Sequence, residues 1–195
     1  DLYASWGSPA ETAIIKAVMA ADGADPESIH IINASGVTFA NLEDDVDLMW
    51  FYEGWDVVAA EQAGLALDYT PLRELDERLN YYTPIIVAAE DTLEDDPELA
   101  EAFLRATSKG YDIASDPAEA EAITDLLLEA SPALDRELVL ESQTFLAGQF
   151  SLGTERWGEM RDEIWDNYTA FMVESELIDT TLPAADLYTN QFLPD

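Results

Sequence analysis

The sequence predicts an α/β fold, with a mostly parallel sheet and its helices in the first 80 residues and a largely helical second half. Short apolar runs alternate with helical patterns up to about residue 80, and this alternation favours right-handed β–α–β units. Beyond residue 80, three X-Pro steps place capping residues before prolines that suit a first helical turn. A chain of 195 residues has room for one or two domains.

Four short apolar runs in the first half are candidate strands. They cover residues 2–6, 29–32, 46–52 and 65–72. Ser8 is expected to cap the first helix, with Pro9 in its first turn and Glu11 completing a capping box. Gly23 is placed to end that helix. Further helical patterns lie near residues 39–42 and over residues 54–63.

The second half begins with one more extended segment, residues 81–88. Helices are then expected over residues 97–114, 117–130, 135–150 and 154–176, with a short helix and a docked strand or loop over residues 182–194. Amphipathic helices need an apolar surface to cover. The sequence offers them one nearby strand, so we expect part of the surface that they cover to be missing from this chain.

Charge excludes several classes of partner. The 42 acidic and 8 basic side chains give a net charge of −34. Nucleic acids and anionic membrane surfaces attract proteins largely through Lys and Arg, so we expect neither as a partner. No apolar run approaches the roughly 20 residues of a membrane span, so we expect no direct membrane insertion of this segment. The 5 Trp, 8 Tyr and 7 Phe argue against a disordered acidic tail. Only Lys16 and Lys109 are lysines, and an acidic, lysine-poor surface suits high salt, which leads to the hypothesis of a halophilic source.

Metal and thiol chemistry are not expected. The chain has no cysteine, which excludes disulfides, thiolate nucleophiles and cysteine-based metal sites. The single histidine, His30, lies in an apolar run and is expected to be buried and structural. The acidic runs at residues 43–47 and 90–96 lack the ligand spacing of a calcium-binding EF-hand loop and are expected to be solvated surface. We therefore expect no metal and no cofactor.

Six segments, in this order, carry a family resemblance. They are residues 6–9 (WGSP), 46–56 (VDLMWFYEGWD), 81–87 (YYTPIIV), 96–111 (DPELAEAFLRATSKGY), 157–160 (WGEM) and 188–194 (YTNQFLP). Together they resemble the NMT1/THI5-like substrate-binding proteins of ABC transporters, of the type that binds thiamine pyrimidine precursors.

The resemblance implies a type II periplasmic-binding-protein-like fold, in which two α/β lobes are joined by a hinge and the ligand lies in the cleft. By this resemblance, residues 1–80 are the second α/β lobe. Residues 81–195 are the crossover strand and the C-terminal helices of the first lobe. The strands that begin the first lobe in this family have no counterpart in the sequence.

A cluster of aromatic residues follows the third candidate strand, at the end where ligands bind in open α/β sheets. Trp50 and Tyr52 share one side of the strand because alternate residues face opposite ways. Glu53 lies on the other side, and Trp55 follows it. A planar heterocycle is expected to stack on one ring while Glu53 accepts hydrogen bonds from its nitrogens. The alternative is core packing for the rings and a solvated carboxylate for Glu53.

Two further pairs are candidate ligand-binding residues. Gly7 and Ser8 precede a helix whose first amides are free to donate to a polar or anionic group. The alternative for this pair is helix capping alone. The resemblance places Tyr81 and Tyr82 at the crossing between lobes, where one ring would cover the ligand. The alternative is packing between the lobes, and the residue that faces the cleft is left open.

The resemblance implies a solute-binding component of an ABC importer and not an enzyme. The expected ligand is a small nitrogen heterocycle, such as a thiamine pyrimidine precursor, and the expected protein partner is an ABC permease. The expected location is extracytoplasmic, in the periplasm or as a cell-surface lipoprotein, although the first residues show no signal-peptide pattern. One alternative is a pyrimidine-forming THI5-like enzyme, against which the single His30 and the absence of cysteine argue. Another is a binding protein for a sulfonate, nitrate or flavin-type ligand.

Overall fold

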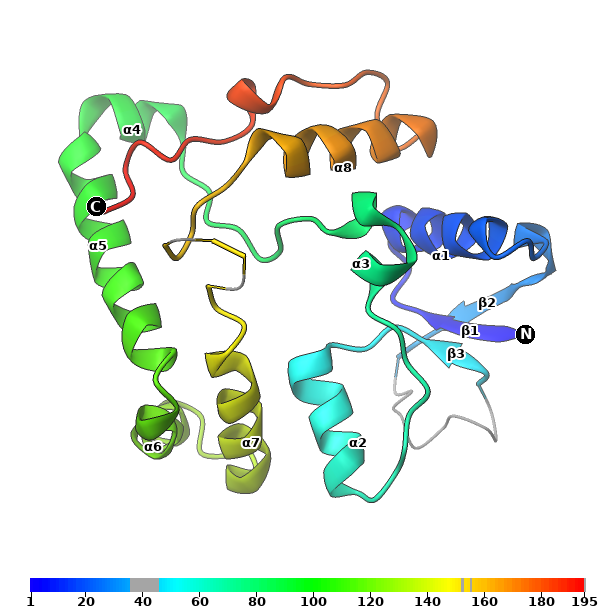
Figure 1. The fold of residues 1–195 in the computed structure, drawn as a ribbon, viewed down its shortest axis with the longest axis horizontal. Coiled ribbons are helices and arrows are strands. Elements are labelled where there is room, and N and C mark those ends of the chain that lie inside the picture. Colours follow the sequence, from blue (N-terminus) through cyan, green and yellow to red (C-terminus); the bar gives the residue numbers. More distant parts are fainter. Residues whose placement is uncertain (36–45, 152, 155, 195) are drawn as a thin grey trace. The chain divides into compact units, whose positions relative to one another are not determined.

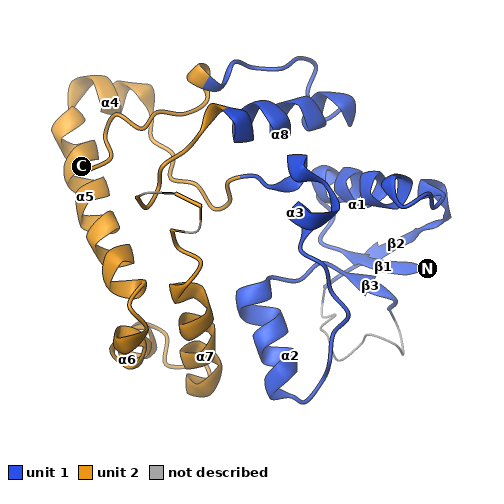
Figure 2. Ribbon diagram, in the orientation of Figure 1, with its two compact units in different colours: residues 1–81, 163–184 blue, residues 82–162, 185–195 orange. Residues whose placement is uncertain are grey.

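The computed structural model describes residues 1–35, 46–151, 153–154 and 156–194 (Figure 1). The chain forms two compact units, shown in different colours in Figure 2. Unit 1 comprises residues 1–81 and 163–184, and unit 2 comprises residues 82–162 and 185–195. The mixed α/β class expected from the sequence is confirmed. The assignment of residues 1–80 and 81–195 to two lobes of a binding protein stays a prediction.

A three-stranded parallel sheet lies in unit 1. The central strand is β1 (Leu2–Ser5), with β2 (His30–Asn33) on one side and β3 (Leu48–Met49) on the other. Both pairings are parallel, and the register places Tyr3 beside Leu48 as well as beside Ile31. Tyr3 and Ala4 are fully buried because β1 has a neighbour on each side.

Two strand predictions were wrong. Only Leu48–Met49 of the apolar run at 46–52 forms a strand. The run at 65–72 forms none, and α3 (Leu72–Leu75) begins directly after Pro71. Proline has no N–H to donate to a strand ladder, and it suits the start of a helix. The helix expected near residues 39–42 lies outside the described residues.

The first helix, α1 (Pro9–Ala21), begins where the sequence predicts, and Gly23 follows it with a φ of +77° that favours glycine. The predicted capping box is wrong. Ser8 is the N-cap residue, but its side chain makes no capping hydrogen bond. The Glu11 carboxylate accepts the N–H of Trp6, which lies two residues before Ser8. A second donor, described below, holds Glu11 in that position.

The helix predicted at 54–63 is present in two parts. Residues Glu53–Val57 form one π-helical turn, η3, and α2 (Val58–Gln62) continues it. Two short 3₁₀ turns, η1 (Pro26–Ser28) and η4 (Glu77–Leu79), also lie among the described residues of this part of unit 1.

The last long helix, α8 (Asp162–Glu174), begins at residue 162 and not at residue 154 as predicted. Gly153 and Gly158 have φ values of +79° and +81°, which an α-helix does not allow. Residues 163–184 belong to unit 1, where Phe171 packs with Ile14 of α1 and Leu79 of η4 in one buried cluster. Figure 1 shows α8 running beside α1.

Unit 2 is helical in its described residues. Its elements are α4 (Glu90–Asp95), α5 (Pro97–Ala114), η5 (Pro117–Glu119), α6 (Ala120–Ala130) and α7 (Arg136–Ala147). The X-Pro steps work as predicted at two helix starts, because Asp96 accepts the N–H of Leu99 and Asp116 accepts the N–H of Ala118. The tail holds a 3₁₀ turn, η6 (Ala184–Asp186), and the rest of it is irregular.

The extended segment expected at residues 81–88 forms no strand. Pro84 lacks a donor, and Val87 is 80% exposed. The α5 helix contains no buried residue, and its apolar residues Leu99 and Phe103 are each 55% exposed. Within the part of the chain that the structure describes, the helices of unit 2 therefore leave apolar side chains uncovered, as the sequence predicts.

Candidate functional site

The carboxyl edge of the sheet in unit 1 is the candidate functional site. All three strands are parallel, so the segments that follow them emerge at this edge. Residues 6–8 follow β1 and lead into α1, and residues 50–52 follow β3 and lead into η3. Ligands of open parallel sheets bind at this edge, because the backbone there turns away from the sheet and exposes side chains and amides.

The loop after β1 is held by a buried carboxylate. Glu11 is 5% exposed, and its carboxylate accepts hydrogen bonds from two donors. The hydroxyl of Tyr3 lies 2.5 Å from Oε1 of Glu11, and the backbone nitrogen of Trp6 lies 3.1 Å from Oε2. Burial, reinforced by the hydrogen bond to Glu11, raises the pKa of Tyr3 far above its usual value. The phenol therefore stays protonated and remains a donor.

Gly7 makes a second fixed contact in this loop. Its N–H donates to Oγ of Ser5, with 2.9 Å between N and Oγ, and its φ of +87° favours glycine. The amides of Trp6 and Gly7 are thus both used inside the loop. The sequence suggested that the N–H of Gly7 donates to a polar or anionic ligand group. Such a group would have to replace Oγ of Ser5 as the acceptor of this N–H. Ser8 is exposed, and the indole of Trp6 is 62% exposed.

The segment after β3 carries the expected aromatic cluster. The N–H of Tyr52 donates to Oδ2 of Asp56 in η3, at 2.8 Å, and its ring is 69% exposed. Glu53 accepts a hydrogen bond from the hydroxyl of Tyr69 at 3.1 Å, and this bond raises the pKa of Tyr69. Trp55 lies in the π-helical turn and is 37% exposed. Single π-helical turns occur often at functional sites.

Trp50 and Tyr81 are anchored in the core of unit 1. Both pack against the cluster of Ile14, Leu79 and Phe171. The ring of Tyr81 also stacks on Tyr168, with 4.3 Å between ring centroids. Burial, with smaller effects from Tyr168 and from Tyr52 nearby, raises the pKa of Tyr81 to about 12. These contacts support the core-packing alternative for Trp50.

Seven of the eight expected site residues lie in unit 1. Trp50, Tyr52 and Tyr81 lie in one region of unit 1, and Gly7, Ser8, Glu53 and Trp55 lie on segments that leave the same sheet edge. Tyr82 belongs to unit 2, where its hydroxyl accepts the N–H of Arg161 at 3.0 Å.

Sequence reasoning missed Trp6 and the carboxylate of Asp56, and it assigned Glu11 to a capping box that does not form. A tryptophan placed between a buried strand and a Gly-Ser-Pro turn was the available signal for Trp6. No sequence signal distinguishes Asp56 from the many other acidic residues.

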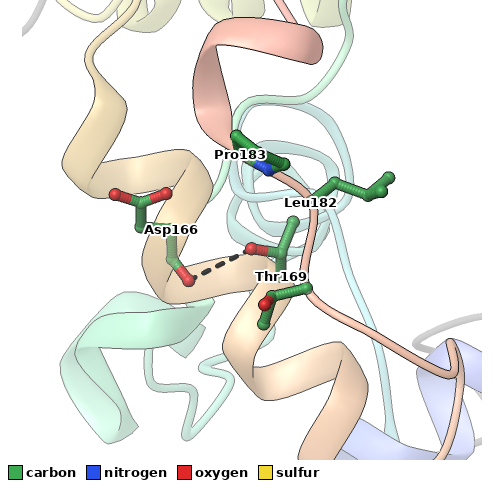
Figure 3. Close-up of a pocket in the computed structure, with 5 residues that line it drawn as sticks. Asp166, Thr169, Leu182 and Pro183 are labelled. Carbon is green, nitrogen blue, oxygen red and sulfur yellow. Dashed lines mark hydrogen bonds between the residues drawn. The ribbon is translucent and has the colours of Figure 1, made fainter.

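A hollow lies along α8 in unit 1 and has a volume of about 340 Å³ (Figure 3). Its lining residues are Asp166, Thr169, Thr181, Leu182 and Pro183. The hydroxyl of Thr169 donates to the backbone carbonyl of Asp166 at 3.2 Å, as Figure 3 shows, and to that of Trp165 at 2.9 Å. None of the residues expected from the sequence lines this hollow.

Metal chemistry finds no support among the described residues. They contain no group of three or more His, Cys, Asp or Glu side chains that would hold a metal ion. His30 is exposed, so the expectation that it is buried was wrong. It stands at the amino end of β2, which is the end of the sheet opposite the candidate site. In the described ranges, no helix combines the length and the apolar character needed to cross a bilayer.

Comparison with known families gave one match. A family model described as NMT1/THI5 like matches residues 2–120, which is more than half of the chain. The matched range contains the whole described sheet, the segments at its carboxyl edge and α5. A comparison with curated proteins gave no match.

Proposed function

Because the chain belongs to the NMT1/THI5-like family, whose members are mostly substrate-binding proteins, we propose that it is the solute-binding component of an ABC importer. The proposed ligand is a small nitrogen heterocycle, with a thiamine pyrimidine precursor as the preferred candidate. The proposed protein partner is an ABC permease. An extracytoplasmic location, typical of the family, follows from this role.

The observation that supports this proposal is that the exposed Tyr52 and the next residue, Glu53, both follow β3 at the carboxyl edge of the sheet. A planar ring gains stacking energy on an exposed aromatic face. Amino and ring N–H groups donate to a carboxylate, and such charge-assisted hydrogen bonds are stronger than neutral ones. This combination suits an aminopyrimidine.

The proposed ligand-binding residues are those expected from the sequence, but we now propose different roles for them. Tyr52, Glu53 and Trp55 are the proposed direct contacts, because their side chains lie on the segment that leaves the sheet edge. Gly7 and Ser8 are proposed to border the ligand. Trp50, Tyr81 and Tyr82 are proposed as supporting residues. Trp50 and Tyr81 pack into the core of unit 1, and Tyr82 holds the backbone of Arg161 in unit 2.

The second candidate is a pyrimidine-forming enzyme of the THI5 kind. Some relatives in this family make the pyrimidine with an iron site and a histidine. In this chain the single histidine, His30, stands at the amino end of β2, away from the edge that carries Tyr52 and Glu53. This placement favours binding over catalysis at the candidate site.

Calorimetric titration of the full-length protein tests the proposal. The probes are a substituted aminopyrimidine, an alkyl sulfonate, nitrate and riboflavin. We expect one aminopyrimidine per protein, and we expect Glu53→Gln to weaken binding by about tenfold, the loss of one charge-assisted hydrogen bond. Tight binding of the sulfonate, nitrate or riboflavin without binding of the aminopyrimidine would contradict the proposed ligand. Formation of pyrimidine by the purified protein supplied with iron would favour the enzyme.

A further inference from the structure

We infer that Trp6 is a ligand-stacking residue and that, together with Tyr52, it selects a planar ligand that is neutral or positively charged. This inference rests on the proposed function and names the class of ligand that the same site takes. It adds a residue that the sequence did not single out and removes anions from the candidate ligands.

Trp6 and Tyr52 both lie on segments that follow neighbouring strands. Trp6 comes directly after β1, and Tyr52 follows β3 by three residues. Because β1 and β3 are paired and parallel, with Ala4 beside Met49, both residues leave the sheet at the same edge. Adjacent strands are about 4.8 Å apart, so two rings at this edge are within reach of one small ligand.

The same kind of hydrogen bond holds the backbone at Trp6 and at Tyr52. In each case the N–H of the aromatic residue donates to a carboxylate in the helical turn that follows. The bond from Trp6 reaches Glu11 over 3.1 Å, and the bond from Tyr52 reaches Asp56 over 2.8 Å. Glu11 is buried, and its carboxylate accepts hydrogen bonds from both Tyr3 and Trp6. The loop is therefore held in the conformation that leaves the indole exposed.

Trp6 and Tyr52 are the most exposed aromatic residues in the described part of unit 1. They are 62% and 69% exposed, against 44% for Tyr69 and 37% for Trp55, whereas Trp50 and Tyr81 pack against the core. A large ring that stays in water on a fixed backbone is ready to stack on a ligand without a further loss of backbone entropy. Stacking on such a ring contributes about 1–3 kcal/mol per heterocyclic base.

Charge decides which planar ligands fit. The amides of Trp6 and Gly7 already donate to Glu11 and Ser5, so neither is available to an anion. Glu53 and Asp56 lie on the segment that carries Tyr52. An anionic ligand would meet these carboxylates, while a neutral amino heterocycle or a cation gains from them and from the faces of the rings.

Two of the three Lys and Arg side chains in the described part of unit 1 are paired with carboxylates. Lys16 of α1 pairs with Glu27 of η1. Arg78 pairs with Asp76 and with Glu174 and lies over the ring of Phe171. Arg73, on α3, is the remaining basic residue of the described part of this unit other than His30.

The test compares variants and ligand charge by calorimetry on the full-length protein. The probes share one ring and differ in charge: a neutral aminopyrimidine, its N-methylated cation and its carboxylate derivative. Trp6→Ala and Tyr52→Ala should each weaken binding of the neutral probe by about 5- to 150-fold. Trp6→Phe keeps a stacking face and should recover most of the affinity. Phe103→Ala, a matched exposed aromatic in unit 2, should leave the affinity unchanged.

Three results would overturn the inference. Wild-type affinity in Trp6→Ala, with urea unfolding showing that the variant is folded, would exclude stacking on Trp6. Binding of the carboxylate probe as tightly as the cation would exclude the charge selection. A wild-type protein that binds a sulfonate or nitrate but none of the three ring probes would contradict the proposed ligand class, and the inference would fail with it. The first two results leave the proposed function intact.

Discussion

The hydroxyl of Tyr3 donates a 2.5 Å hydrogen bond to Oε1 of Glu11, and both residues are buried. Tyr3 lies in the central strand and Glu11 in the first turn of α1, so the bond ties the sheet to its first helix. The same carboxylate accepts the N–H of Trp6. This bond therefore supports both the packing of unit 1 and the loop at the candidate site.

We expect Tyr3→Phe to destabilise the protein by about 1–3 kcal/mol, because the buried carboxylate of Glu11 loses a donor. The measurement is the free energy of unfolding in urea. Tyr69→Phe is the matched control, since it removes a tyrosine hydrogen bond to the carboxylate of Glu53 at an exposed position. Its effect should stay within about 0.5 kcal/mol. Equal decreases in the free energy of unfolding in the two variants would show that burial of Glu11 does not increase the stabilisation from its hydrogen bond to Tyr3.

Alkaline pH should weaken unit 1 through Tyr81. Its pKa in the folded protein is raised to about 12, mainly by burial, whereas an unfolded tyrosine titrates near 10. The stabilisation is fully present below pH ~10 and is lost as the pH rises from ~10 to ~12. Tyr81→Phe keeps a ring to stack on Tyr168 and has no proton to lose.

The free energy of unfolding of the wild type should therefore fall by about 1 kcal/mol more than that of Tyr81→Phe between pH 10 and pH 12. This is less than two full pKa units would give, because Tyr81 is partly exposed and solvent screens its charge. Parallel pH profiles of the two proteins would contradict this expectation.

High salt should stabilise the protein. A net charge of −34 creates repulsion among surface carboxylates, and salt shortens the range of that repulsion from about 10 Å at 0.1 M to about 3 Å at 1 M. We expect the free energy of unfolding in urea to rise by ~2 kcal/mol between 0.1 M and 2 M KCl. Neutralising the four exposed acids of α4 (Glu90, Asp91, Glu94 and Asp95) as amides should reduce this rise. Full stability at low ionic strength would argue against the halophilic hypothesis.

Thr124 should tolerate loss of its hydroxyl. It is fully buried in α6, and its Oγ1 has no hydrogen-bond partner within the described residues. Valine has nearly the same shape and no polar atom, so Thr124→Val should leave stability unchanged or raise it by about 1 kcal/mol. Thr124→Ser keeps the hydroxyl and loses the methyl group, and it should destabilise. A loss of stability in Thr124→Val, measured by thermal unfolding, would show that the hydroxyl is bonded in solution.

Helix starts and the family were readable from the sequence because their signals are local. Asp96 caps α5 through a bond to Leu99, three residues away, and Asp116 caps η5 through a bond to Ala118, two residues away. The strands were less readable. The run at 65–72 has the apolar composition of a strand but forms none, while two residues at 48–49 form β3 because they lie beside β1.

The candidate site was readable in part. The aromatic cluster at 50–55 stands at a strand end, and its composition pointed to stacking. Trp50 has the same composition signal as Tyr52, yet Trp50 packs against the core and Tyr52 is exposed. Exposure depends on what packs against a residue, and Trp50 packs against a cluster that contains Phe171 of α8, far away in the sequence.

The sequence by itself determined the α/β class, the acidic surface, the capped helix starts and the membership of the family. Each of these depends on composition or on residues a few positions apart. Only the tertiary structure decided that residues 163–184 join unit 1, that Glu11 is buried under Tyr3 and Trp6 rather than closing a capping box, and that Trp6 is exposed. The physical reason is that burial and hydrogen-bond choice depend on contacts between distant segments. A carboxylate accepts hydrogen bonds from those donors that the folded chain places next to it, and these bonds matter most where the carboxylate is buried away from water.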